Sequence, residues 1–309
     1  MAFVKEDISF LSSDGKNTVR GEINLPEGEP LAVIAISHGM VDHIGRYGEL
    51  VKYMTDRGFV VAGNDHLGHG RTVAKKEDFG YFAHKGGYKL VIDDLKKMND
   101  LLRERFSGLK IFLLGHSMGS FMARLYAEKY PESIDGIIIH GTGGKNPLLP
   151  FGKALAGITR FFSGDRYRAR LVTKMAFGAY NKRFDKAEGE NAWLTREGSL
   201  VADRATDPLV QFIFSSAAYS DLFKSIGLCN SGAHFKAYPK GLATLVMSGD
   251  ADPVGNYGRG VIFVHKKLRE NGVSDLTLKL YEGARHELFN ERNREEVFAD
   301  IFAWIKARI

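Results

Sequence analysis

The sequence predicts an α/β protein, with a mostly parallel central sheet flanked by helices and an inserted helical cap. Strand-like apolar runs alternate with helical patterns up to residue 141, and the same alternation resumes at Leu242. Because alternating strands and helices form right-handed crossovers, they build a parallel sheet covered on both faces. The interruption assigns residues 1–141 and 242–309 to the core and residues 142–241 to the cap.

The expected elements follow the chain in order. A hairpin around Asn17 to Pro26 comes first. Short apolar runs then predict strands near residues 31–37, 59–64, 110–115, 135–140, 242–247 and 276–281. Apolar residues at helical spacing predict helices over residues 47–57, 88–106, 117–130 and 257–271, and a last helix from Asn290.

A serine lies where one strand must turn sharply into a helix. The motif Gly115-His116-Ser117-Met118-Gly119 directly follows the apolar run 111–114. A hydroxyl becomes a useful nucleophile only when the backbone exposes it to a base, and small residues two before and two after permit that turn. Such a motif can arise by chance in a chain with 35 glycines, but the strand before it and the helix after it favour a nucleophile.

A nucleophilic serine needs a carboxylate and a histidine, which follow it along the chain in this kind of strand-to-helix elbow. The predicted strand 242–247 ends in a turn that offers Asp250 and Asp252. We expect Asp252 to be the acid because it lies deeper in the loop, whereas Asp250 is placed to cap the turn.

Only two of the ten histidines follow Asp252 in the sequence, namely His265 and His286. His265 falls on a predicted helix, whereas His286 lies in a loop after a strand and is free to orient as a base. We therefore expect His286 to take the proton of Ser117, while Asp252 holds the imidazole ring and stabilises its cationic form.

Attack on an ester creates an oxyanion that needs two backbone donors, one of them from the residue after the nucleophile. Met118 occupies that position. The second donor comes from a loop after an earlier strand, and the run Leu31 to Ile36 leads into Ser37-His38-Gly39-Met40. We expect the N–H group of Met40 to be this donor.

Two further stretches carry a family resemblance. The segments Ser-His-Gly-Met-Val-Asp-His-Ile-Gly-Arg-Tyr at 37–47 and Asp-His-Leu-Gly-His-Gly-Arg-Thr at 65–72 resemble the monoacylglycerol lipase and lysophospholipase branch of the α/β-hydrolases, and the likeness spans nearly the whole chain. The resemblance implies the α/β-hydrolase fold and the same triad and oxyanion donors. It also implies that three residues lie near the polar end of the substrate, namely Asp42, His43 and Arg46.

Two other clusters have competing interpretations. One carboxylate and two histidines lie within residues 65–69, but no second cluster with metal-ligand spacing accompanies them. The glycine-rich run 141–144 lacks the lysine and the helix start of a phosphate-binding loop. We expect no metal and no cofactor.

The composition suits one compact enzyme, since 44% of the 309 residues are hydrophobic and 26% are charged. Cys229 is the only cysteine, so no intramolecular disulfide forms, which fits a reducing compartment. Met1 to Lys16 resembles neither a signal peptide nor an anchor, and no apolar run approaches a membrane span. We expect a cytoplasmic protein.

The basic charge of the chain is concentrated in the predicted cap. Residues 145–186 contain ten basic and two acidic residues, whereas the whole chain has a net charge of +6. A general nucleic-acid role is therefore not expected. The apolar residues among these charges suit contact with an anionic membrane surface or an acyl pocket, and equally a solvated basic face packed on the core. They are Phe161, Phe162, Leu171, Met175, Phe177 and Tyr180.

These features together predict a serine hydrolase that cleaves carboxylic esters of single-chain acyl lipids, monoacylglycerols or lysophospholipids, through an acyl-serine intermediate. One alternative is a serine aminopeptidase of the proline-iminopeptidase type, although no acidic cluster is clearly placed to bind a free amino terminus. Another is a non-catalytic ligand receptor on a hydrolase fold, which would be expected to lose a triad member.

Overall fold

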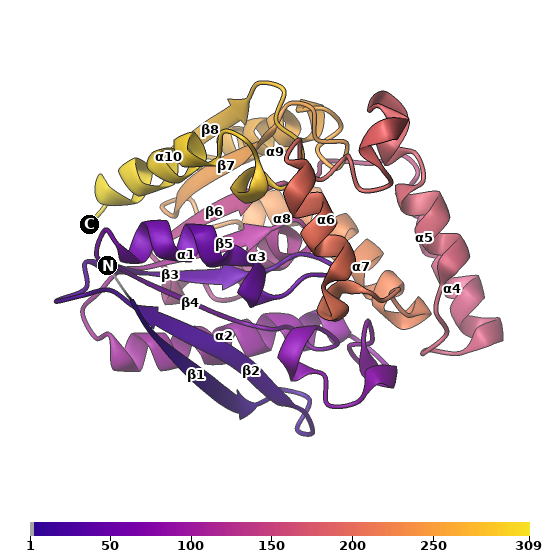
Figure 1. Ribbon diagram of the computed structural model, residues 1–309, viewed down its shortest axis with the longest axis horizontal. Helices are drawn as coiled ribbons and strands as arrows, with labels where there is room; N and C mark the ends of the chain where they lie inside the picture. The colour runs from indigo at the N-terminus through magenta and orange to yellow at the C-terminus, as the bar shows by residue number, and fades with distance from the viewer. Residues whose placement is uncertain (1–2) are drawn as a thin grey trace.

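The computed structural model describes residues 3–309 and is built around one eight-stranded sheet (Figure 1). The strand order is β1-β2-β4-β3-β5-β6-β7-β8. β2 pairs antiparallel with β1 and β4, and the other pairs are parallel. The strands are Val4–Leu11, Thr18–Leu25, Ala32–Ser37, Phe59–Asn64, Ile111–His116, Gly136–His140, Ala243–Gly249 and Leu276–Tyr281, numbered β1 to β8 in this order.

Helices cover both faces of the sheet because the central strands are apolar on both faces. Side chains alternate along a strand, so Val33, Leu113 and Ile139 pack toward one group of helices, and Ile34 and Leu114 pack toward another. The first group is α2 (Gly87–Arg105), α3 (Met118–Lys129) and α9 (Arg259–Glu270). The second is α1 (Gly48–Thr55) and α10 (Arg294–Lys306).

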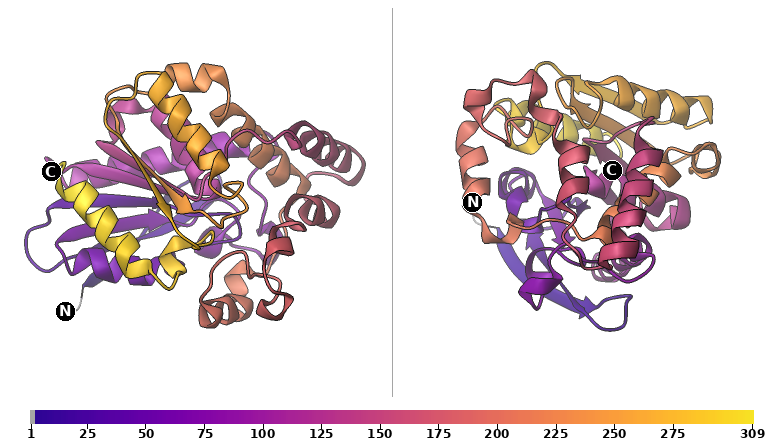
Figure 2. Two further views of the ribbon diagram at one scale, coloured as in Figure 1. Left: turned by 90° about the horizontal axis from the view of Figure 1, so that it is seen from above. Right: turned by 90° about the vertical axis from the view of Figure 1, so that its right-hand side faces the viewer.

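The segment between β6 and β7 is helical. It contains α4 (Leu149–Ser163), α5 (Arg170–Phe177), α6 (Gly198–Thr206), α7 (Ser216–Cys229) and α8 (Gly232–Ala237). α4 and α5 project away from the sheet (Figure 2), whereas α7 packs on α2 and α3, and α8 packs on α3. The second half of this segment therefore adjoins the core helices. The expected cap boundaries at residues 142 and 241 stay a prediction.

The predicted fold class is confirmed: a mostly parallel sheet lies between helices, with a helical insertion before the last two strands. Two details differ from the expected elements. The first strand of the hairpin, β1, is an edge strand with five of its eight residues exposed, so it lacks a clear apolar signal. The last helix begins at Arg294 rather than Asn290, because a 3-10 turn at Leu288–Asn290 precedes it.

In the described residues 3–309, every helix is too short or too polar to cross a lipid bilayer. The cytoplasmic location expected from the sequence stays a prediction.

Candidate active site

Ser117 lies in the sharp turn between β5 and α3. Its backbone has φ of 52°, a left-handed conformation that is uncommon for a residue with a side chain. A Cβ on Gly119 would collide with the carbonyl oxygen of Ser37, and one on Gly115 would lie 2.6 Å from the carbonyl oxygen of Gly119. Both glycines therefore allow the helix to start directly behind the strand, which lifts the Ser117 side chain clear of the backbone.

The structure brings Ser117, His286 and Asp252 together from three loops. The Ser117 hydroxyl lies 2.8 Å from Nε2 of His286, and Nδ1 of His286 lies 2.9 Å from Oδ2 of Asp252. His286 and Asp252 are both buried. With Nδ1–H donating to the carboxylate, Nε2 is left to accept the serine proton, as a general base requires.

The two candidate acids have different surroundings. Asp252 accepts hydrogen bonds from the Ser248 hydroxyl at 3.0 Å and the Val254 N–H at 2.8 Å, in addition to His286. Asp250 is exposed and accepts from the N–H of Gly283 at 2.7 Å. Asp250 therefore stabilises the turn after β7, whereas Asp252 is hydrogen-bonded to His286.

The two expected oxyanion donors adjoin residues at the nucleophile: Met118 follows Ser117 in the chain, and Met40 follows Gly39, where a Cβ would lie 3.4 Å from Cβ of Ser117. In the part of the chain that the structure describes, neither the Met40 N–H nor the Met118 N–H is hydrogen-bonded to another protein group. Met118 is the first residue of α3, where N–H groups have no partner within the helix. Two backbone donors near the serine thus stay available to a developing oxyanion.

His38 fixes the peptide group that carries the Met40 N–H. Its Nδ1–H donates to the carbonyl oxygen of Gly39 at 2.8 Å, and its Nε2 accepts from the N–H of His66 at 2.9 Å. Burial lowers the pKa of His38, which favours the neutral ring that these two bonds require. Because the two ends of a trans peptide point in opposite directions, holding the Gly39 carbonyl also aims the Met40 N–H.

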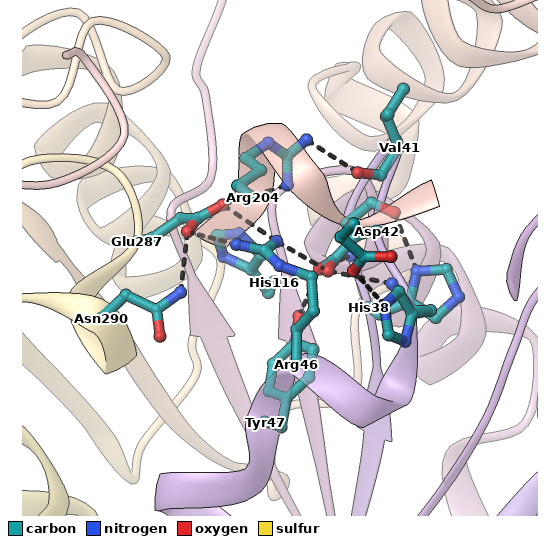
Figure 3. A network of polar contacts seen from close by, with 12 residues as sticks. His38, Val41, Asp42, Arg46, Tyr47, His116, Arg204, Glu287 and Asn290 are labelled. Carbon is teal, nitrogen blue, oxygen red and sulfur yellow. Dashed lines mark hydrogen bonds and ion pairs between the residues drawn. The ribbon is translucent and has the colours of Figure 1, made fainter. Parts of the chain in front are cut away.

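Asp42 and Arg46 belong to a polar network that includes Glu287, the residue after His286 (Figure 3). Arg46 donates to Asp42 at 2.9 Å and to both carboxylate oxygens of Glu287 at 3.2 and 2.9 Å. Tyr47 also donates to Asp42 at 2.9 Å. Burial raises the pKa of Glu287, but the guanidinium groups of Arg46 and Arg204 outweigh it and hold that pKa at about 2.

His43 faces the cap instead. Its Nε2 lies 2.8 Å from a carboxylate oxygen of Asp207, which precedes the 3-10 turn η7 (Pro208–Val210). Two of the three residues that the resemblance implied for substrate contact thus meet other charged side chains of the core, and His43 meets the cap.

Glu287 and Arg204 are members of this network that the sequence argument missed. Glu287 directly follows His286, and its position in a loop with the proposed base is the only sequence signal for it. Arg204 lies in α6, far from the triad in sequence, and its guanidinium is 3.7 Å from Glu287. No motif connects these positions, since the contact arises only from folding.

A short cap segment forms hydrogen bonds with the loop that carries His286. We call this loop, residues 282–293, the histidine loop. The backbone N–H of Glu287 donates to the carbonyl of Leu194 at 2.7 Å, and that of His286 to the carbonyl of Trp193 at 3.4 Å. The Trp193 ring lies 5.1 Å from the ring of His286. Arg196 adds an ion pair to buried Glu291 at 2.8 Å. The cap therefore covers the histidine and shares its backbone hydrogen bonds.

The cluster at residues 65–69 supports the loops around the site. Asp65 accepts from the N–H groups of Ile44 at 2.9 Å and Arg71 at 2.7 Å. His66 Nε2 lies 3.1 Å from the Ser37 hydroxyl. These partners occupy both carboxylate oxygens of Asp65 and Nε2 of His66.

Comparisons with known proteins show what the chain is similar to in sequence and in fold. A family model described as serine aminopeptidase, S33, matches residues 28–293. The monoacylglycerol lipase of Mycolicibacterium smegmatis is 25% identical over 99% of this chain and 98% of that protein. The human monoglyceride lipase is 27% identical over 92% of this chain and 85% of that protein. A thermostable carboxyl esterase from Bacillus coagulans, solved with glycerol, superposes with a TM-score of 0.92 at 29% identity and covers 100% of this chain and 99% of that one.

Proposed function

The chain belongs to the α/β-hydrolase family described as serine aminopeptidase, S33, and from that premise we propose that it cleaves carboxylic esters of single-chain acyl lipids. Monoacylglycerols and lysophospholipids are the substrates that we propose. Relatives named monoacylglycerol lipase and monoglyceride lipase support this substrate class. The observation that carries the proposal is the hydrogen-bonded series Ser117, His286 and Asp252.

The proposed reaction has two halves. Ser117 Oγ attacks the ester carbonyl while His286 Nε2 takes its proton, and the resulting oxyanion accepts hydrogen bonds from the Met40 and Met118 N–H groups. The intermediate collapses to an acyl-serine, and His286 returns the proton to the departing alcohol. Water then attacks the acyl group with His286 as base, which releases the fatty acid and restores Ser117.

The aminopeptidase alternative requires an unpaired carboxylate near the serine to bind a free ammonium group. The nearest acidic groups in the described network are Asp42 and Glu287, and both are paired with Arg46. Arg204 adds a second positive charge beside Glu287. Since two cations already balance two carboxylates, this region offers little attraction to an amino terminus, which favours the ester substrate.

The experiment compares monoacylglycerols, lysophospholipids, short nitrophenyl esters and proline amides with the native protein and with Ser117→Ala. We expect ester turnover to fall by about 10⁴-fold or more in the variant. A fluorophosphonate probe should label the native protein and leave Ser117→Ala unlabelled. Full turnover by Ser117→Ala contradicts the mechanism, cleavage of amides alone favours the aminopeptidase, and an unlabelled native protein favours the receptor.

We further propose that α4 and α5 contact an anionic lipid surface. Phe161 and Phe162 are 82% and 80% exposed, and Leu148 is 71% exposed. Such large apolar side chains in the open, among basic residues, are typical of a helix that lies in a membrane interface.

Some basic side chains of residues 145–186 already form ion pairs with carboxylates. Arg160 and Arg166 form ion pairs with Asp165 and Asp78. In residues 3–309, Arg170 and Lys174 have no carboxylate within ion-pair distance, so they are among the cations that we assign to lipid. Arg170→Glu with Lys174→Glu should weaken binding to phosphatidylglycerol vesicles, and unchanged binding would contradict the proposal.

A further inference from the structure

Val41, the residue after Met40, has a strained backbone. Its φ is 52°, and a β-branched side chain in this left-handed region is an outlier. Such a conformation persists only when the surrounding structure holds it, and it often marks a functional site. The hydrogen-bond partners of Val41 therefore indicate what keeps its backbone in this conformation.

His69 holds the N–H of Val41. The Val41 N–H donates to Nε2 of His69 at 3.2 Å, and Nδ1–H of His69 donates to the carbonyl of Leu67 at 3.0 Å. Burial lowers the pKa of His69 to about 3, so the ring stays neutral and Nε2 remains an acceptor. The rings of Phe82 and Phe214 pack against His69 and fix its position.

Arg204 holds the carbonyl of Val41 from the cap. Its Nη2 donates to the Val41 oxygen at 2.7 Å, and the side chain is 13% exposed (Figure 3). The other terminal nitrogen faces Glu287 at 3.7 Å. Arg204 thus links α6 to the loop that carries the Met40 N–H and to the histidine loop.

We propose that Arg204 and His69 are positioning residues for the oxyanion donor at Met40, so that the donor is correctly aimed only when α6 is seated on the core. His38 holds the Gly39 carbonyl, His69 holds the Val41 N–H and Arg204 holds the Val41 carbonyl. These bonds fix three consecutive peptide groups, namely the two that flank Met40 and the one that follows Val41. The inference rests on the proposed function, because it assigns the Met40 N–H to an ester oxyanion.

The test compares 4-nitrophenyl butanoate with its O-4-nitrophenyl thionobutanoate analogue. Sulfur accepts hydrogen bonds weakly, so turnover of the thionoester depends less on the oxyanion donors. Arg204→Met should lower kcat on the carbonyl ester by about 10- to 100-fold, with little change in KM, and should lower kcat on the thionoester less. The carbonyl-to-thiono ratio should therefore fall. His69→Phe, which removes the acceptor for Val41, should shift the ratio in the same direction.

Arg168→Met is the matched control. Arg168 is also a cap arginine that donates to backbone carbonyls, those of Glu77 at 2.7 Å and Ile213 at 3.1 Å. Its loss should lower thermal stability without changing the ratio between the two esters. A ratio that falls equally in Arg168→Met would mean that general loosening of the cap is responsible, and the proposal would be overturned.

A double variant tests whether Arg204 acts by holding the strained backbone of Val41. Glycine adopts positive φ at no steric cost, so Val41→Gly should keep the loop conformation with fewer restraints. Arg204→Met should then cost no more than about 3-fold in the Val41→Gly background, which is a smaller loss than in the native chain.

The outcomes separate the two proposals. A native protein that hydrolyses neither ester contradicts the proposed function. A native protein that is active, but whose ester ratio is unchanged by Arg204→Met and by His69→Phe, contradicts only the positioning role.

Discussion

Asp250 and Asp252 are two residues apart in the same turn, yet only Asp252 meets His286. Asp252→Asn should lower kcat by about 10³- to 10⁴-fold, because an amide in this position favours the wrong tautomer of the histidine. Asp250→Asn should change kcat by less than about 3-fold, since surface substitutions of this kind have small effects. Steady-state kinetics on a short nitrophenyl ester measure both, and equal losses would contradict the assignment.

Glu287 makes stability depend on pH. Its pKa is about 2 in the folded chain against an ordinary value of 4.5, so its stabilising contribution is fully present above pH 4.5 and is lost as the pH falls through 2. Glu287→Gln should lower the free energy of unfolding at pH 7 by roughly 2–3 kcal/mol. The difference from the native protein should shrink between pH 4.5 and pH 2.5 in urea denaturation. A constant difference would mean that the carboxylate charge is not responsible.

At the scale of single residues, the sequence predicts those that obey a chain order and misses those that depend on distant contacts. Ser117, Asp252 and His286 each follow a strand, so the order of elements alone suggests them. Arg204 reaches Val41 across 163 positions and carries no local signal. Long polar side chains in a helix are usually solvated, and only the fold reveals that this one is no more than 13% exposed.

Among the structural elements, α3 depends most strictly on a small residue. Gly119 lies against the carbonyl of Ser37, so a methyl group there would push the helix from the sheet. Gly119→Ala should destabilise the protein by about 1–3 kcal/mol and reduce kcat, because the strained turn at Ser117 would move.

Gly157 in α4 provides the matched control. A Cβ there meets no atom within 4 Å, and alanine is a better helix former than glycine by about 1 kcal/mol. Gly157→Ala should therefore keep kcat and raise the melting temperature slightly. Thermal unfolding and ester kinetics check both variants, and equal effects of the two would contradict the packing argument.

The strands were predictable to different degrees. β3, β4, β5 and β6 are buried along their whole length, which gives continuous apolar runs. β1 alternates between exposed and half-buried residues at the edge of the sheet, and its pairing with β2 gives it its place. Local composition identifies buried strands, whereas an edge strand is defined by its neighbour.

On the scale of the whole molecule, the proposed lipid contact can be tested separately from the chemistry by changing the two exposed phenylalanines. Phe161→Ser with Phe162→Ser should leave turnover of a soluble butanoate ester within about 2-fold, because neither side chain is buried. Turnover of monoacylglycerol in anionic vesicles should fall about 10-fold, since less apolar surface enters the lipid. Equal rates on both substrates would contradict a lipid-docking role.

The hydrogen bonds from Glu287 and His286 to the Leu194 and Trp193 carbonyls also limit how such enzymes can be recombined. A chimera that exchanges only residues 142–241 with a relative would replace the acceptors and retain the donors. It would also separate Arg204 from the strained Val41. The smallest unit that can be exchanged is therefore the cap together with residues 38–47 and 282–293. A chimera that receives all three segments from a relative should show the substrate range of that relative.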